Sequence, residues 1–196
     1  MNGATPPAAR PRDLTAYRFR RIEPADAPRL AHAFTQLSPT SRYHRFLAPV
    51  QSLSEAQLRT FAEVDFVDHV AWVAEVTDRP ERTLAGVGRW IRSTRDPACA
   101  EIALTVIDAY QGRGLGTALL GLLVGSARSR GIQWFEATVL GENLRMRALL
   151  SRCGATRVGF DLGAYTYRLA VPTAGRRLVR PAQERVTSEG RTHASA

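Results

Sequence analysis

Hydrophobic residues recur along the chain with two different spacings. Short runs that are apolar throughout, or at every second position, are typical of β-strands, especially where Val, Ile, Leu and aromatic residues dominate. Glycine, proline and polar residues separate these runs. The pattern predicts strands over Tyr17–Ile22, Val70–Val76, Thr83–Ile91, Cys99–Ile107, Trp134–Leu140, Thr156–Phe160 and Tyr165–Ala170.

Helix signals lie between several of these runs. Proline and acidic residues just after Ile22 suit a first helical turn, and Ser38 precedes a proline as an N-cap does. Further along, leucines recur at helical spacing from Leu115, and glycines follow the last two helical segments as C-caps. The predicted helices begin near Pro24, cover Ser38–Phe46 and Ser54–Ala62, run from Leu115 to about Ser129 before Gly131, and cover Asn143–Arg152 before Gly154.

The order of these elements predicts an α/β fold. A hairpin-like pair of strands, joined by the turn Thr77-Asp78-Arg79-Pro80, is followed by strand–helix–strand units, so the central sheet is mixed and flanked by helices. The 196 residues suit one domain, which we place at 17–171. Residues 1–16 are rich in Ala, Pro and Arg, and residues 172–196 are polar, so both are predicted to be flexible tails.

Composition narrows the class of protein. The net charge is +9 and all 27 basic residues are arginine, but residues 17–171 carry only +5 by count (20 arginines, 15 acids) and no basic stripe with interleaved aromatics. Nucleic acid is therefore not an expected partner. No signal peptide or membrane-spanning run is evident, and two isolated cysteines suit a reducing cytoplasm. The four histidines lack metal-ligand spacing, so no metal is expected.

The segment DAYQGRGLGTALL, from Asp108 to Leu120, places a glycine-rich turn between a strand and a helix. Unpaired amides and the helix dipole make such a turn an anion site, although glycines also occur in simple tight turns. A P-loop needs a lysine, which this chain lacks. A dinucleotide fold needs a third glycine where Thr117 stands, and Glu136 lies inside a strand rather than at its tip. Neither of these two phosphate sites fits.

Charge is distributed unevenly along the chain. Residues 111–152 hold six arginines and two acids, whereas residues 52–81 hold seven acids and two arginines. A basic segment beside the glycine loop suits a polyanionic cofactor. An acidic segment elsewhere would attract a cationic acceptor such as a protonated amine.

The loop Gln111-Gly112-Arg113-Gly114-Leu115-Gly116 resembles the phosphate-binding loop of the GNAT superfamily of N-acetyltransferases, and Asn143 and Gly154 match the family's later helix. The resemblance covers Tyr17–Ala170 in element order. It implies a GNAT-like, mostly antiparallel sheet and acetyl-CoA as co-substrate. It also implies a set of cofactor-binding residues, with backbone N–H groups of the strand pairing with the pantetheine arm: Val106, Ile107, Gln111, Gly112, Arg113, Gly114, Leu115, Gly116, Thr117 and Asn143.

Acetyl transfer to an amine needs a base, because an alkyl ammonium with a pKa near 10.4 is almost fully protonated at neutral pH. Glu101 is the predicted base: alternation places it on one strand face with Ala103 and Thr105, and related protein-lysine acetyltransferases use a glutamate near this point. Asp65, Asp68 and His69 are the rivals. Leu150 occupies the position where many family members have a proton-donating tyrosine, so no general acid is assigned.

The acceptor stays open at this stage. The segment LSPTSRYHRFL at Leu37–Leu47 resembles a helix on the acceptor side of Pat-type bacterial protein acetyltransferases. That resemblance favours a protein lysine as acceptor. A small-molecule amine is the first alternative, and a non-catalytic acetyl-CoA-binding sensor module is the second.

Overall fold

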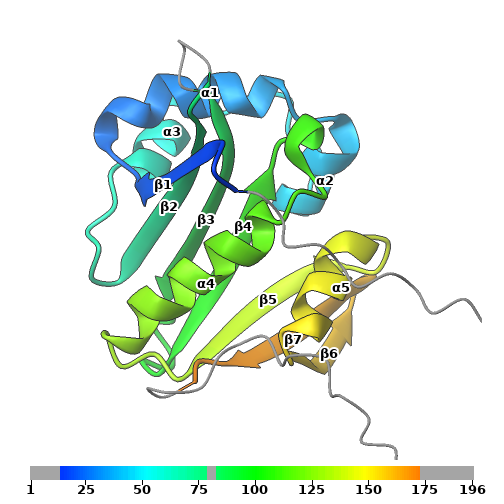
Figure 1. Cartoon of the computed structure of the whole chain (residues 1–196). Coiled ribbons are helices and arrows are strands. Elements are labelled where there is room, and N and C mark those ends of the chain that lie inside the picture. The colour runs from blue at the N-terminus through cyan, green and yellow to red at the C-terminus, as the bar shows by residue number, and fades with distance from the viewer. Residues whose placement is uncertain (1–13, 79–82, 173–196) are drawn as a thin grey trace, which may run out of the picture.

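The computed structural model of the chain describes residues 14–78 and 83–172. Its centre is a sheet in the order β1-β2-β3-β4-β5-β7-β6 (Figure 1). The strands are β1 (Tyr17–Arg21), β2 (His69–Val76), β3 (Leu84–Arg92), β4 (Cys99–Val106), β5 (Trp134–Leu140), β6 (Thr156–Asp161) and β7 (Ala164–Ala170). Neighbours pair antiparallel except β4 and β5, which are parallel.

Helices cover both faces of this sheet. The α-helices are α1 (Ala27–Thr35), α2 (Pro39–Phe46), α3 (Glu55–Ala62), α4 (Leu115–Arg128) and α5 (Leu144–Arg152), with short 3₁₀ turns at Pro24–Asp26 and Asp108–Tyr110. Leu119 and Leu123 of α4 pack on β3 and β4, and α1 to α3 cover the opposite face of the N-terminal strands (Figure 1). The predicted α/β fold with a mixed, mostly antiparallel sheet is confirmed.

Close approach of α4 to the sheet depends on a glycine. A Cβ built at Gly88 of β3 would lie 2.9 Å from Leu104 Cδ2 and 3.2 Å from Leu119 Cβ. The first distance is shorter than real Cβ contacts and the second is tighter than most, so Leu104 and Leu119 would have to shift to admit a side chain. Glycine at this position therefore lets α4 pack closely against β3 and β4. The position of α4 matters because its N-terminus adjoins the candidate site.

The sequence-based boundaries agree with the structure to within about one residue for every strand. At the first helix the chain makes a 3₁₀ turn before α1 begins at Ala27. Residues 14–16 of the predicted N-terminal tail are described: the carbonyls of Leu14 and Ala16 accept from the amides of Tyr17 and Thr77. The Pro172 carbonyl accepts from Arg128. The rest of both predicted tails lies outside the described residues. Within the described ranges, no helix has the length and apolarity that a membrane span requires.

Candidate active site

β4 and β5 separate soon after they begin. Their parallel register holds for three pairs, the last being Glu101 with Glu136. Beyond it, β4 continues along β3 and β5 continues along β7, so the two strands diverge (Figure 1). The amide of Ile107 donates to Ala85 on β3 at 2.9 Å. Since backbone groups alternate in direction along an antiparallel strand, the amides of Leu104 and Val106 point the other way, into the opening.

A groove of about 810 Å³ occupies this opening. It extends from β4 across the glycine loop to α5, with α2 forming one wall. This volume lies within the range of small-molecule and cofactor sites. His44 of α2 and Glu142 before α5 face each other across it, with Nε2 and Oε1 3.4 Å apart but no hydrogen bond.

The N-terminus of α4 opens into the groove without a cap. Gly114 is its N-cap residue, with φ of 97°, and offers no side-chain acceptor. The first intrahelical bond runs from Ala118 to Gly114, so the amides of Leu115, Gly116 and Thr117 have no acceptor among the described residues. Three free amides and the positive end of a helix dipole favour an anion at this point.

Among the described residues, three of the other four α-helices cap their first turns with a side chain, whereas α1 follows a 3₁₀ turn. The side chains of Ser38, Ser54 and Asn143 accept from the backbone amides that open α2, α3 and α5. The open end of α4 is therefore a local departure from how this sequence begins its helices. That departure lies at the residues where an anionic ligand was predicted to bind.

Side-chain contacts hold the glycine loop in place. Gln111 donates to the Val106 carbonyl at 3.0 Å and accepts from Arg145 of α5. On the other side, the Asp108 carboxylate accepts from the Ser38 amide at 3.0 Å and from the Ser41 hydroxyl at 2.8 Å. Burial pushes the pKa of Asp108 up, but these hydrogen bonds outweigh it and leave the pKa lowered. The loop is thus tied to α2, β4 and α5 before any ligand binds.

Most of the predicted cofactor-binding residues meet in this groove. Two do not line it. The Ile107 side chain is buried in the core just after β4, and the Arg113 guanidinium donates to Tyr17 Oη at 3.3 Å and to the Ala109 carbonyl at 3.0 Å. Those that line it are Val106, Gln111, Gly112, Gly114, Leu115, Gly116, Thr117 and Asn143.

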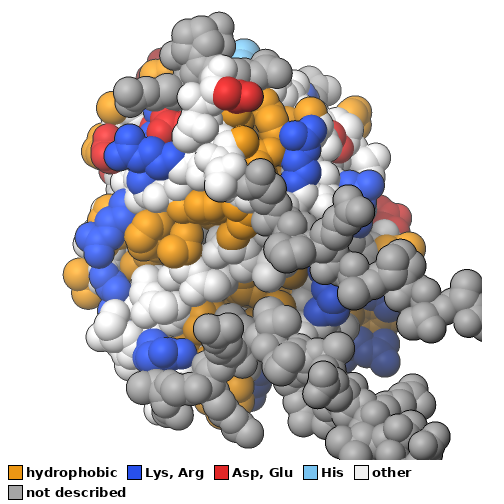
Figure 2. Space-filling model, in the orientation of Figure 1, with side chains coloured by type: hydrophobic (Ala, Val, Ile, Leu, Met, Phe, Trp, Pro, Cys, Tyr) orange, Lys and Arg blue, Asp and Glu red, His pale blue; other side chains and the backbone are white. Residues whose placement is uncertain are grey.

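Three arginines that line the groove were not predicted from the sequence: Arg45 of α2, and Arg145 and Arg152 of α5. For Arg145 and Arg152, their separation of seven residues, which places two side chains on one helix face, was the available signal. On the face shown in Figure 2, visible carboxylates lie in the upper half, whereas arginines are spread over the lower half as well. This agrees with the uneven charge along the sequence.

The predicted base, Glu101, is an exposed residue at the point where β4 and β5 begin to separate. Its face of β4 is that of Ala103 and Thr105, as alternation predicted, and it is opposite the face covered by α4. Thr105 lines the groove. The Glu101 carboxylate also opposes the lowering of the Arg45 pKa that burial causes. Glu101 is thus solvent-accessible and near groove residues, and its role stays a prediction.

The rival acids are engaged in structural contacts. Asp65 Oδ1 accepts from the amides of Val67, Asp68 and His69 at 2.8–2.9 Å, which lowers the pKa of its carboxyl. Asp68 forms an ion pair with Arg92 at 2.6 Å. A carboxylate that caps a turn or binds a guanidinium is a poor proton acceptor.

His69, the half-buried first residue of β2, is neutral. Burial, followed by the nearby Arg89 guanidinium, lowers the pKa of His69 to about 4. Arg89 Nη1 lies 3.1 Å from His69 Nε2. Because a guanidinium only donates, Nε2 must be the unprotonated acceptor. A ring that binds a proton only near pH 4 is unsuited to take one from an ammonium at neutral pH.

This lowered pKa predicts acid sensitivity of the fold. Between about pH 6.5 and pH 4 the unfolded chain binds a proton at His69 and the folded chain does not, so stability falls as pH falls through that window. We expect His69→Gln, which keeps an acceptor for Arg89, to remove on the order of 2 kcal/mol of this loss. Urea unfolding across the window measures it. The exposed His32→Gln variant is the control, and an unchanged pH dependence in His69→Gln would contradict the assignment.

Several known proteins are similar to this chain. A family model described as an acetyltransferase (GNAT) domain matches residues 17–156. Acetyltransferase Pat from Mycolicibacterium smegmatis is 36% identical over 154 residues, covering 79% of this chain and 45% of that protein. Acetyltransferase PA5475 from Pseudomonas aeruginosa is 30% identical over 136 residues, covering 69% and 73%. The crystal structure of the GNAT domain of S. lividans PAT superposes with a TM-score of 0.73 at 34% identity, covering 79% and 90%.

Proposed function

This chain belongs to the acetyltransferase (GNAT) family, and from that premise we propose that it transfers the acetyl group of acetyl-CoA to a primary amine. The observation that carries the proposal is the uncapped N-terminus of α4 at the glycine loop, inside a groove of about 810 Å³. Family membership supports an acyltransferase. The donor and acceptor are part of the proposal.

The groove suits each part of the donor. The diphosphate would accept hydrogen bonds from the amides of Leu115, Gly116 and Thr117, with Arg145 and Arg152 of α5 supplying charge. The pantetheine arm would extend along the free edge of β4, where the Val106 amide points into the groove. Ile107 and Arg113 keep only a positioning role here, because their donors are already used within the protein.

The reaction needs three proton transfers. Glu101, directly or through a water molecule, would take a proton of the acceptor ammonium, after which the amine nitrogen attacks the thioester carbon. The C–N bond forms and the nitrogen loses its second proton to solvent, while the C–S bond breaks and coenzyme A leaves as a thiolate. A thiol with a pKa of about 8.5 is a fair leaving group, so solvent can return the proton. This matters because Leu150, where many family members carry a tyrosine, is fully buried and apolar.

Two acceptor classes follow from this proposal. The resemblance to Pat-type enzymes favours the side-chain amine of a protein lysine, and a small amine is the alternative. The chain spans less than half the length of Mycolicibacterium smegmatis Pat, so that protein's activity cannot be assumed here. A non-catalytic sensor would bind acetyl-CoA without releasing a thiol.

Acetyl-CoA binding and thiol release test the proposal together. At about 100 times its Kd, acetyl-CoA should stabilise the fold by about 2.7 kcal/mol, which a thermal shift detects. Because the chain contains no lysine, side-chain self-acetylation at lysine does not consume the donor, and thiol release reports an added amine. Binding without turnover on lysine peptides or small amines would favour the sensor. Absence of binding would overturn the proposal.

A further inference from the structure

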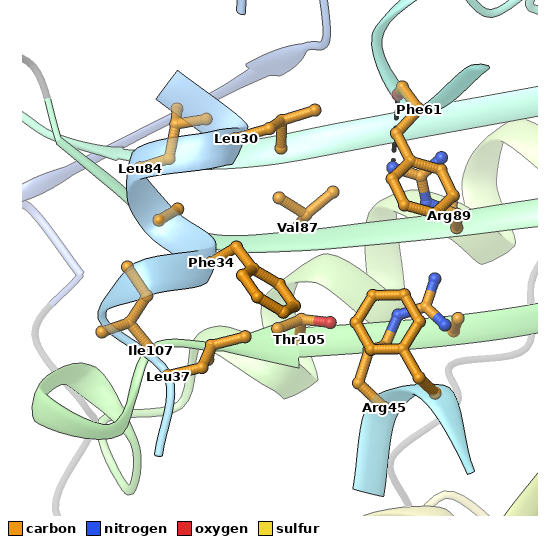
Figure 3. A pocket seen from close by; sticks show the side chains of 14 residues that line it. Leu30, Phe34, Leu37, Arg45, Phe61, Leu84, Val87, Arg89, Thr105 and Ile107 are labelled. Atoms are coloured by element: carbon orange, nitrogen blue, oxygen red, sulfur yellow. Dashed lines mark hydrogen bonds between the residues drawn. The ribbon is translucent and has the colours of Figure 1, made fainter. Parts of the chain in front are cut away.

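A second cavity lies on the face of β3 and β4 that α1, α2 and α3 cover, opposite α4 (Figure 3). Its volume is about 60 Å³ and its walls are mainly aliphatic and aromatic. The polar side chains in its lining are Arg45 of α2, Arg89 of β3 and Thr105 of β4. Arg45 and Thr105 also line the groove, so the cavity and the groove meet at these two residues.

Arg89 is a buried cation with an incomplete set of partners. Its side chain rises from the middle of β3 and the residue is 5% exposed. One Nη donates to His69 and the other to the Phe61 carbonyl at 3.2 Å, while Cζ lies 4.6 Å from the centroid of the Phe61 ring. Since His69 is neutral, neither partner carries a negative charge. Burial, and then the nearby Arg45, lowers the pKa of Arg89 to about 9, so it is still charged at neutral pH.

Arg45 approaches the same end of the cavity from α2 (Figure 3). Its guanidinium contacts the rings of Phe46 and Phe61 at 5.0 and 6.0 Å from their centroids. Among the described residues it forms no hydrogen bond and no ion pair. Glu101 influences it electrostatically from beyond ion-pair distance. Five N–H donors are therefore available on a partly buried cation.

Another pair of neighbouring arginines in this chain has carboxylate partners. Arg20 and Arg29 share the carboxylates of Asp26 and Glu75 at 2.7–3.4 Å, and both acids are almost fully buried. No described carboxylate lies within ion-pair distance of Arg45 or Arg89. Two desolvated cations held together without an anion are costly to a fold. The arrangement is explained if the missing anion arrives with a ligand.

We propose that this cavity binds the carboxylate of the acetyl acceptor, which makes the acceptor a small molecule that carries both an amine and a carboxylate. The inference rests on the proposed acetyl transfer, because the cavity adjoins the groove at Arg45 and Thr105. Guanidinium forks bind carboxylates through paired, charge-assisted hydrogen bonds. A water occupies about 30 Å³ in the liquid, so the cavity has room for a carboxylate and little more.

The size of the cavity sets the expected substrate class. With the carboxylate inside, an amine one carbon away would stay at the shared edge of the groove, within reach of the thioester. An α-amino acid meets this requirement, and its aliphatic side chain would contact the apolar rim. A protein lysine meets it less well, because its amine lies far from any fixed carboxylate.

Matched acceptors test the inference. L-Leucine and L-leucinamide differ only in the carboxylate, and the amide has the more easily deprotonated amine, with a pKa of about 8. A preference for leucine therefore cannot arise from amine basicity. We expect kcat/KM, measured by thiol release, to be about 10- to 100-fold higher for leucine, as charged hydrogen bonds of this kind provide. Equal rates, or turnover only with lysine peptides, would overturn the inference.

Variants of the cavity arginines test whether these side chains cause the preference for leucine. Arg45→Gln and Arg89→Gln should each abolish the preference for leucine over leucinamide while acetyl-CoA still binds. Arg59→Gln, an exposed arginine of α3 paired with Glu55, should keep it. If the Arg89 variant does not fold, calorimetric titration of leucine into the wild-type protein saturated with CoA gives an independent answer: leucine binds and leucinamide does not. Equal binding of both, or of neither, would contradict the inference.

The two proposals fail in distinguishable ways. Loss of acetyl-CoA binding in the wild-type protein would overturn the acetyl transfer itself. If acetyl-CoA binds but thiol release is equally fast with leucine and with leucinamide, only the carboxylate site is overturned.

Discussion

Replacement of Glu101 by glutamine is expected to lower kcat by about 10²–10⁴-fold and to leave acetyl-CoA affinity unchanged. Glutamine keeps the size and hydrogen-bonding capacity of the side chain but cannot accept the ammonium proton. Glu101 is exposed on β4 and hydrogen-bonds to no other side chain among the described residues. The substitution should therefore not disturb the fold. Single-turnover thiol release at saturating acetyl-CoA measures the effect on the chemical step.

Glu136→Gln is the matched control for this prediction. Glu136 stands opposite Glu101 in the register of β4 and β5, but its carboxylate binds Arg168. Loss of the general base also removes the fall of kcat/KM at acidic pH, which a merely structural effect would not do. Unchanged turnover in Glu101→Gln would move the assignment to Asp65 or Asp68. Those two acids are weaker candidates because a turn and an ion pair already engage them.

The local features of this site could be predicted from the sequence because local signals fix them. Helix N-termini are predicted at Ser38, Ser54 and Asn143, and all three residues cap helices in the structure. Period-2 alternation correctly separated the Glu101 face of β4 from the face packed against α4. Alternation does not decide which residues at the end of β4 line the groove. Leu104, Thr105 and Val106 all line it, whereas Ile107 packs in the core.

The arginine cavity could not be predicted from the sequence. Arg45 lies on a short helix and Arg89 on a buried strand, and no repeat or spacing links positions so far apart. Their proximity results from α2 packing against β4 while β3 pairs with β4. The sequence also gives no sign that the buried acids pair with Arg20 and Arg29 instead. Such pairings depend on tertiary packing, which a single sequence does not encode in any local pattern.

Gly114→Ala is expected to weaken acetyl-CoA binding by about 10- to 100-fold, the equivalent of one or two lost charge-assisted hydrogen bonds. Gly114 has φ of 97°, a conformation in which any Cβ is strained. Relief of that strain would turn the following amides away from the groove. Because Leu115, Gly116 and Thr117 supply the free amides, a small rotation at their N-cap displaces the whole anion site. Calorimetric titration with acetyl-CoA measures the loss.

A second glycine of the same helix separates this effect from a general loss of stability. Gly121 lies in the middle of α4, and a Cβ built there meets no atom within 4 Å. Gly121→Ala should raise stability by about 0.5–1 kcal/mol through helix propensity and leave binding unchanged. Both variants add one methyl group to α4 or its N-cap, so only the backbone conformation at position 114 distinguishes them. Equal affinities in the two variants would mean that the loop amides do not hold the diphosphate.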